Sequence, residues 1–333
     1  MIRNRKYILL QIIAVAIISV PFILDDKYIF HIAVMSGIYM ILSMSLNVQL
    51  GFTGLFSFGH AAFYGIGAYA SALLTRDLGL PFVAAFILSG LFTAFIGTLI
   101  ALPALRLKGI FLAIGTMCFN EIFCLLSTNL ESLTGGPAGL PDIPVPSVFG
   151  LEITQPKDYY ILITLLVLVT YKVFDNLIKS RHGRALTSIR DDEIAARAIG
   201  VNITNYKIKV FAITAFFAGL SGSFFAHYLS YISPSNFALS ESFNLMAMIA
   251  LGGIGNLPGS IVGAGILVII PEVFRFLQDY RELIYGLTIV LIVLLLPQGI
   301  IGWISGLLHR QQTSQDLAGS PKKFSVETIL HRI

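Results

Sequence analysis

The segment KSRHGRALTSIRDDEIAARAIGVNITNYKIK, from Lys179 to Lys209, is the only long polar and charge-dense stretch that lies between long apolar ones. Elsewhere the chain is strongly apolar: 56% of its 333 residues are hydrophobic, 12% are charged, and the mean hydropathy is +0.83. Soluble domains carry about twice as many charged residues. The composition therefore predicts a membrane protein, and the polar segment is the place where a soluble partner can bind it.

The apolar runs predict an all-α, polytopic integral membrane protein. A helix of about 20 residues crosses the roughly 30 Å hydrocarbon core of a bilayer. Seven runs have about that length: Tyr7–Leu24, Ile29–Leu50, Leu80–Leu102, Gly109–Thr128, Asp158–Phe174, Ile208–Ile232 and Leu283–Trp303. A further run, Pro258–Leu277, is interrupted by glycine and proline. Two more, His60–Thr75 and Ser242–Ile254, are short for a full crossing and are true crossings, half-helices or re-entrant loops. Together they predict about ten transmembrane helices.

The positions of the basic residues predict that both termini are cytoplasmic, because Lys and Arg are retained on the inner side of the membrane. In a ten-span arrangement, only five of the 22 Lys and Arg residues fall in outer loops: Lys27, Arg76, Lys157, Arg275 and Arg281. The formal charge of +4 thus reflects topology, and no nucleic-acid partner is expected. We expect a transmembrane domain over residues 1–306, with a cytoplasmic loop at 176–207 and an outer loop at 129–157, and a flexible cytoplasmic tail over 307–333.

No motif for nucleotide or metal chemistry is present. The dipeptide Gly-Lys never occurs, so the chain has no G-x-x-x-x-G-K-[ST] phosphate loop, and the six histidines have no metal-ligand spacing. Gly65 to Ala70 fits the dinucleotide pattern G-x-G-x-x-A, but it lies in an apolar run without a preceding soluble strand, which favours close helix packing. The sequence therefore predicts a non-catalytic chain without a cofactor or a metal.

Acidic residues inside membrane spans are few. Intramembrane carboxylates are costly and often mark proton relays or ion pathways. The two candidates are Glu121, near the middle of a span, and Glu272, near an outer end. Glu121 is either a functional acid or a polar contact inside the helix bundle, and the scarcity of such residues argues against a proton-driven transporter.

The polar segment contains signals for one short helix. Ser188 followed by Asp191 matches a helix start, and Gly200 followed by Asn202 matches a helix stop. We expect a helix over Ile189–Ile199, with a Glu193–Arg197 pair. The small-residue surface that we expect it to present is formed by Ile189, Ala195, Ala196 and Ile199. Such a helix is either a docking element or a solvated connection between two spans.

The stretch GRALTSIRDDEIAARAIGVNITNYK resembles the cytoplasmic loop of ABC-transporter permeases for branched-chain amino acids. Two more stretches, Leu46–Leu74 (LNVQLGFTGLFSFGHAAFYGIGAYASALL) and Met248–Gly265 (MIALGGIGNLPGSIVGAG), are similar to the N- and C-terminal signatures of that family. The stretch LTGGPAGLPDIPVPSVFGLEI, Leu133–Ile153, looks like the outer loop of the longer, LivM-type subunit. The resemblance covers nearly the whole chain up to Gly306.

The resemblance implies a permease subunit of an ATP-driven importer in a bacterial inner membrane. Its implied partners are a sister permease, two cytoplasmic ATP-binding subunits that hydrolyse ATP, and a periplasmic amino-acid-binding protein. The residues implied in coupling to the ATPases are Arg190, Asp191, Asp192, Glu193, Ala195, Ala196 and Gly200. A permease for urea or short amides, an ion-coupled amino-acid carrier, and a membrane receptor or scaffold that passes no solute remain open.

Two Gly-rich breaks, Gly51–Gly59 and Gly252–Gly259, are candidates for the solute path. Irregular backbone at membrane depth is tolerated only where it borders a cavity or is buried in protein. The predicted path residues are Asn47, Gly51, Thr53, Ser57, Gly59, His60, Asn244, Gly252, Gly253 and Gly255. The alternative is that these glycines only let helices pack closely.

The outer loop is rich in glycine and proline. We expect it to dock the binding protein or to form an outer gate, through Gly135, Gly136, Pro137 and Gly139. The alternative is a structural cap on the bundle.

Overall fold

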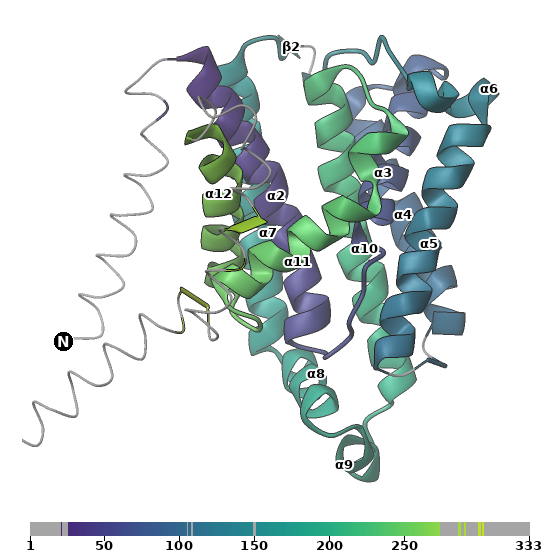
Figure 1. Cartoon of the computed structure of the whole chain (residues 1–333), viewed down its shortest axis with the longest axis vertical. Coiled ribbons are helices and arrows are strands. Elements are labelled where there is room, and N and C mark those ends of the chain that lie inside the picture. Colours follow the sequence, from purple (N-terminus) through teal and green to yellow (C-terminus); the bar gives the residue numbers. More distant parts are fainter. Residues whose placement is uncertain are drawn as a thin grey trace, which may run out of the picture.

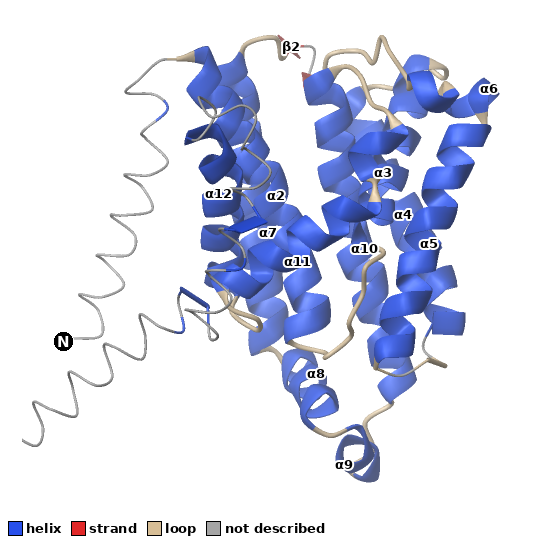
Figure 2. Cartoon of the chain, viewed as in Figure 1, coloured by secondary structure: helices blue, strands red, loops and turns tan. Residues whose placement is uncertain are grey.

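The structure is a computed structural model that describes residues 26–104, 106–107, 109–148 and 151–273, with the isolated positions 21, 286, 287, 290, 299, 300 and 302. These residues form a helical bundle (Figures 1 and 2). The predicted spans Tyr7–Leu24 and Leu283–Trp303, the last residues of Pro258–Leu277 and the tail 307–333 lie outside the described residues, apart from the isolated positions.

Among the described residues, five helices are long and apolar enough to cross a membrane: α2 (Lys27–Gly51), α4 (Phe82–Ala104), α5 (Ile110–Asn129), α7 (Pro156–Lys179) and α10 (Ile203–Leu229). They match five of the seven long runs that hydropathy predicts. α2 and α10 are mostly buried, whereas α4, α5 and α7 expose most of their side chains, including Leu91, Phe95 and Leu165. Large apolar side chains on the outside suit a bundle that is solvated by lipid.

Three shorter helices complete the described bundle. α3 (His60–Arg76) has 17 residues, α11 (Leu239–Gly252) has 14, and α12 (Leu257–Val273) has 17. At 1.5 Å per residue α11 is about 21 Å long, too short to cross the hydrocarbon core. Residues 52–59 lead from the end of α2 up to the start of α3 (Figure 1), and residues 230–238, with the 3₁₀ helix η2 (Pro234–Phe237), lead from α10 to α11.

Small residues let the central helices approach closely. A Cβ atom on Gly67 of α3 would overlap the backbone of Gly219 on α10, and one on Gly222 would overlap the carbonyl of Tyr64. These contacts confirm that the G-x-G-x-x-A match is a helix-packing feature.

The loop at residues 129–157 carries short elements that hydropathy does not predict: α6 (Glu131–Thr134), η1 (Gly136–Ala138), β1 (Ser147–Val148) and β2 (Leu151–Glu152). The two strands, of two residues each, pair antiparallel, and the long elements that the structure describes are helices, in agreement with the all-α prediction. Two-residue strands are too short to produce a recognisable alternation of side chains.

The polar segment forms two helices where the sequence analysis expects one. α8 (Arg181–Asp191) and α9 (Glu193–Ala198) project from one end of the bundle (Figure 1). Asp192 between them is extended, and its carboxylate accepts hydrogen bonds from Ile194 N at 2.7 Å and Ala195 N at 3.1 Å. Because Asp192 starts a new helix, the predicted helix Ile189–Ile199 is wrong. The true start signal of the first helix is Ser180, which caps His182 N.

Candidate functional site

The start of the first Gly-rich break, at Gly51, lies against the second break, and Asn47 joins the two. Its side-chain oxygen accepts a hydrogen bond from Gly255 N at 2.8 Å. Its amide nitrogen lies 3.0 Å from the carbonyl of Asn256, 3.3 Å from that of Gly253 and 2.6 Å from Ser260 Oγ. Asn47 is fully buried, so it joins the end of α2 to the turn between α11 and α12.

Glycine is required on both sides of this junction. A Cβ atom on Gly51 would overlap the backbone of Gly255, and one on Gly252 would overlap the carbonyl of Gly259. Gly253 and Gly255 have φ angles of 115° and 79°, which L side chains rarely adopt. Asn47, Gly51, Gly252, Gly253 and Gly255 therefore form one closed contact, which we name the glycine junction.

The polar segment reaches this junction through Arg190, in the last turn of α8. Its Nη1 donates a hydrogen bond to the carbonyl of Gly51 at 2.8 Å, and its Nη2 pairs with Asp191 at 3.0 Å. The guanidinium group thus sits at the C-terminal end of α2, where the helix dipole favours a positive charge. Arg190 connects the projecting helices directly to the glycine junction.

The other predicted path residues before and in α3 are buried and make internal contacts. Ser45 Oγ lies 2.7 Å from His60 Nε2, Thr53 Oγ1 donates to the carbonyl of Val48 at 3.2 Å, and Ser57 Oγ accepts from Gly59 N at 3.4 Å. The start of α3 meets the start of α11, since Ala61 N donates to Ser242 Oγ at 3.2 Å. Two helices thus begin side by side within the bundle.

Glu241 is an acidic residue that the sequence analysis missed. It lies in the first turn of α11, where Tyr39 OH donates to its carboxylate at 2.7 Å and Asn244 Nδ2 donates to it at 3.1 Å. The predicted span began at Ser242, which placed Glu241 outside the membrane. The sequence SPSN at 233–236 could have indicated this position, because its capping box starts a short helix that turns the chain back into the bundle before α11.

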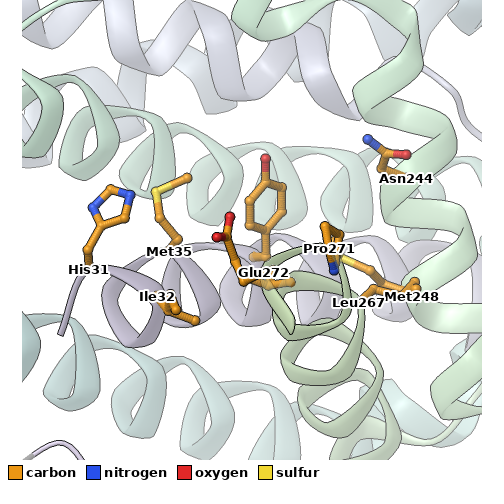
Figure 3. Close-up of a pocket in the computed structure, with 10 residues that line it drawn as sticks. His31, Ile32, Met35, Asn244, Met248, Leu267, Pro271 and Glu272 are labelled. Atoms are coloured by element: carbon orange, nitrogen blue, oxygen red, sulfur yellow. The ribbon is translucent and has the colours of Figure 1, made fainter. Parts of the chain in front are cut away.

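A groove of 440 Å³ runs between α2, α11 and α12 (Figure 3). Its polar lining comes from His31, Tyr39, Asn244 and Glu272, and its apolar lining includes Met35, Met248 and Leu267. Asn244 is a predicted path residue that lines this groove, and Tyr28 OH donates a hydrogen bond to Glu272, which also lines it.

Helix α5 is hydrogen-bonded to the two irregular segments that precede α3 and α11, residues 52–59 and 230–238. Thr116 Oγ1 accepts a hydrogen bond from Phe58 N at 3.0 Å, and Asn120 Nδ2 donates to the carbonyl of Phe237 at 3.3 Å. Glu121, the next residue, is exposed and makes no hydrogen bond or ion pair with the described part of the chain. The interpretation of Glu121 as a polar contact inside this bundle is therefore wrong.

The tip formed by α8 and α9 combines a buried anchor with an exposed apolar surface. Ile189 and Ala196 are buried against Ile203 of α10, which corrects the expectation that both face outward. Ile194 and Ile199 are 83% and 77% exposed. Apolar side chains this exposed on a polar projection mark a surface that a protein can cover.

An ion pair anchors the start of α9, and a glycine turn follows its end. Glu193 pairs with the buried Lys207 of α10 in place of the expected Arg197. A buried ammonium group without a partner charge is strongly destabilising, so the pair with Lys207 is favoured. Gly200 ends the projection with a φ of 87°, in agreement with its predicted left-handed stop. Asn202 instead caps α10, since its side chain accepts from Asn205 N at 3.1 Å.

The loop at residues 129–157 is hydrogen-bonded to the segment that follows α10. Leu140 and Ile232 exchange backbone hydrogen bonds of 2.7 and 3.2 Å, and His227 Nδ1 lies 2.8 Å from the carbonyl of Pro144. Gly135, Gly136 and Gly139 have φ angles of 74°, 59° and 76°, so they shape turns. Pro137 is exposed and is the member of the predicted docking set that a partner can reach.

Comparisons with known proteins identify the family of this chain. Residues 28–296 match the family model described as the branched-chain amino acid transport system permease component. The chain is 36% identical to the high-affinity branched-chain amino acid transport system permease protein LivM of Salmonella typhimurium and 35% identical to LivM of Escherichia coli, in each case over 90% of this chain and 75% of the relative. It is 23% identical to LivH of Salmonella typhimurium, over 85% of this chain and 97% of the relative. No solved structure matches the chain. The chain therefore belongs to the family of permease components of branched-chain amino acid transport systems.

Proposed function

We propose that this chain is the LivM-type permease subunit of an ATP-driven importer of leucine, isoleucine and valine in a bacterial inner membrane. It forms the solute path with a sister permease, receives the amino acid from a periplasmic binding protein and is driven by two cytoplasmic ATP-binding subunits. Its relatives' names, its five long apolar helices and its exposed α8–α9 tip support this proposal. ATP hydrolysis belongs to the separate subunits.

The topology that we propose has ten spans and cytoplasmic termini. The described helices support it because successive passes run in opposite directions, and α3 and α11 are completed as passes by residues 52–59 and 230–238. The transmembrane domain then covers residues 1–306, with the coupling loop at 176–207, the periplasmic loop at 129–157 and a cytoplasmic tail at 307–333.

The hydrogen bond from Arg190 to Gly51 is the observation that carries the coupling mechanism. We propose that the ATPases bind the exposed face of the tip, around Ile194, Ala195 and Ile199. A displacement of the tip then moves Arg190 and, through Gly51, the end of α2. Asp191 holds the guanidinium, Asp192 starts α9, and Ala196 anchors α9 from inside, so these residues position the tip.

The solute path in this proposal depends on the glycine junction and on the start of α3. The junction, including Asn47, acts as the hinge between α2 and the α11–α12 turn. Thr53, Ser57, Gly59 and His60 shape the irregular segment beside it, and Asn244 contributes a polar group to the groove. On the outer side, the exposed Pro137, held by the turns at Gly135, Gly136 and Gly139, contributes to docking of the binding protein.

The test is uptake of labelled leucine, with labelled urea as the contrast, into proteoliposomes that hold this chain, the sister permease, the ATPases and the loaded binding protein. We expect ATP-dependent uptake of leucine. Arg190→Gln should lower uptake while ATP hydrolysis continues, because the bond to Gly51 is lost. Arg184→Gln, an exposed arginine of the same helix, is the matched control and should keep both activities.

Other outcomes would replace the proposal. Uptake of urea without leucine would assign the chain to the amide permeases. Leucine uptake that persists without the ATPases would indicate an ion-coupled carrier. A complex that assembles but transports neither solute would indicate a receptor or scaffold.

A further inference from the structure

Glu121 is the charged residue closest to the middle of α5 (Ile110–Asn129, 20 residues), and it is exposed. At 1.5 Å per residue it lies more than 10 Å from either end of the helix. Its carboxylate has no hydrogen-bond or ion-pair partner in the described part of the chain. A charge that faces hydrocarbon at this depth is strongly unfavourable, so this side of α5 must face water or another polar group.

The contacts of α5 show on which flank Glu121 lies. Asn120 and Cys124 both bond to the carbonyl of Phe237, in the irregular segment 230–238. Glu121 is about 60° from Cys124 and about 100° from Asn120 around the helix axis. It therefore lies next to the flank that is bonded to the irregular segment.

The opposite flank of α5 is apolar. Phe119 and Phe123 contact the rings of Phe63 and Tyr69 on α3, at centroid distances of 5.3 and 6.3 Å. Leu126 on that side is 53% exposed and suits contact with lipid. The side of α5 that carries Asn120 and Cys124 borders backbone that cannot face lipid, and Glu121 lies next to that side. Glu121 is the charged member of an exposed stripe that also contains Ile114, Cys118 and Leu125.

We propose that Glu121 faces a water-filled solute path and that its carboxylate binds the ammonium group of the amino acid as it passes. This inference rests on the proposed function and adds a substrate-contacting residue to it. No residue of α5 is basic, so the cation that pairs with the Glu121 carboxylate comes from outside this helix. A branched-chain amino acid supplies that cation, and its apolar side chain suits Ile114 and Leu125, which share the exposed stripe with Glu121 and Cys118.

Cys118 is a natural reporter because it is exposed and lies one helical turn before Glu121. In the full complex with Cys124→Ser, we expect Cys118 to react with a cationic, membrane-impermeant methanethiosulfonate faster than with the anionic analogue. Glu121→Gln should remove that preference, and leucine transport should slow the reaction. Leu126→Cys, with Cys118→Ala and Cys124→Ser, is the matched control on the apolar flank and should react only with a lipid-soluble maleimide.

The proposal is overturned if Cys118 reacts only with the lipid-soluble maleimide, which would place this flank in lipid. It is also overturned if Cys118 reacts with none of the reagents, which would place the flank against the sister permease. Both results are independent of which solute the complex carries.

Transport gives the second test. At saturating loaded binding protein, Glu121→Gln should lower the maximal rate of leucine uptake by about tenfold, the factor expected for one lost charge-assisted contact. Glu121→Asp should restore part of the rate, and ATP hydrolysis should continue. Wild-type uptake by the Gln variant would overturn the inference, whereas a wild-type complex that takes up no leucine would overturn the proposed function itself.

Discussion

Gly200 ends the α8–α9 tip, and this end depends on the backbone conformation of that one residue. Its φ is 87°, and a Cβ atom there would meet nothing within 4 Å, so a substitution acts through backbone strain alone. We predict that Gly200→Val inserts normally but lowers the uptake per ATP hydrolysed, because about 1–2 kcal/mol of strain displaces the α8–α9 tip. The measurement is the ratio of leucine uptake to phosphate release.

The matched variant is Gly200→Asn, since asparagine tolerates the left-handed conformation better than other residues. It should retain most of the coupling. Normal transport by a correctly inserted Gly200→Val protein would show that the left-handed stop has no role in coupling.

At the scale of elements, the packing of α11 against α12 depends on glycines that differ sharply in their surroundings. A Cβ atom on Gly263 would overlap the carbonyl of Met248, whereas one on Gly265 would meet only the flexible Met40 Cε at 3.3 Å. We predict that Gly263→Ala destabilises the protein by about 1–3 kcal/mol, because the two helices must separate, and that Gly265→Ala has little effect.

The measurement is the midpoint of thermal unfolding in detergent for the two variants. Both substitutions lie in the same helix and add the same methyl group, so helix propensity cancels between them. Equal midpoints would mean that α11 and α12 move apart without cost.

At the scale of the whole molecule, the arrangement of helices predicts which loops share a side of the membrane. The loop that contains β2 and the α8–α9 tip lie at opposite ends of the bundle (Figure 1). Val145 is exposed in this loop, and Arg197 is exposed in α9. In a chain without its two native cysteines, we predict that Val145→Cys reacts with an impermeant maleimide in intact cells. Arg197→Cys should react only after the membrane is opened.

A peptide tag after residue 310 provides the third position, and it should behave like Arg197→Cys. Reaction of the tag from outside would require an odd number of spans. Reaction of both cysteines from outside would contradict the antiparallel arrangement of the described helices.

Hydropathy and local signals predicted much of this protein. The five long spans, the close packing of α3 through Gly65 and Gly67, and the left-handed Gly200 could all be read from neighbouring residues. This is possible because an apolar helix satisfies its own backbone hydrogen bonds, and because a left-handed stop depends on one residue. Capping signals alone did not decide where the helices of the polar segment begin, since Ser180, Ser188 and Asp192 are all suitable caps. Burial of Ile189 and Ala196 against Ile203, with the Glu193–Lys207 pair, favours the break at Asp192.

Only the tertiary structure decided which parts of the chain meet. Asn47 closes on Gly255 across 208 positions of sequence, and Arg190 reaches Gly51 across 139. The return of residues 230–238 into the bundle placed Glu241 beside Tyr39, and the packing of α5 turned Glu121 outward. Membrane crossing follows from the composition of about 20 consecutive residues. The pairing of the breaks and the direction of each polar side chain follow from contacts between distant segments, so they arise only when the helices pack together.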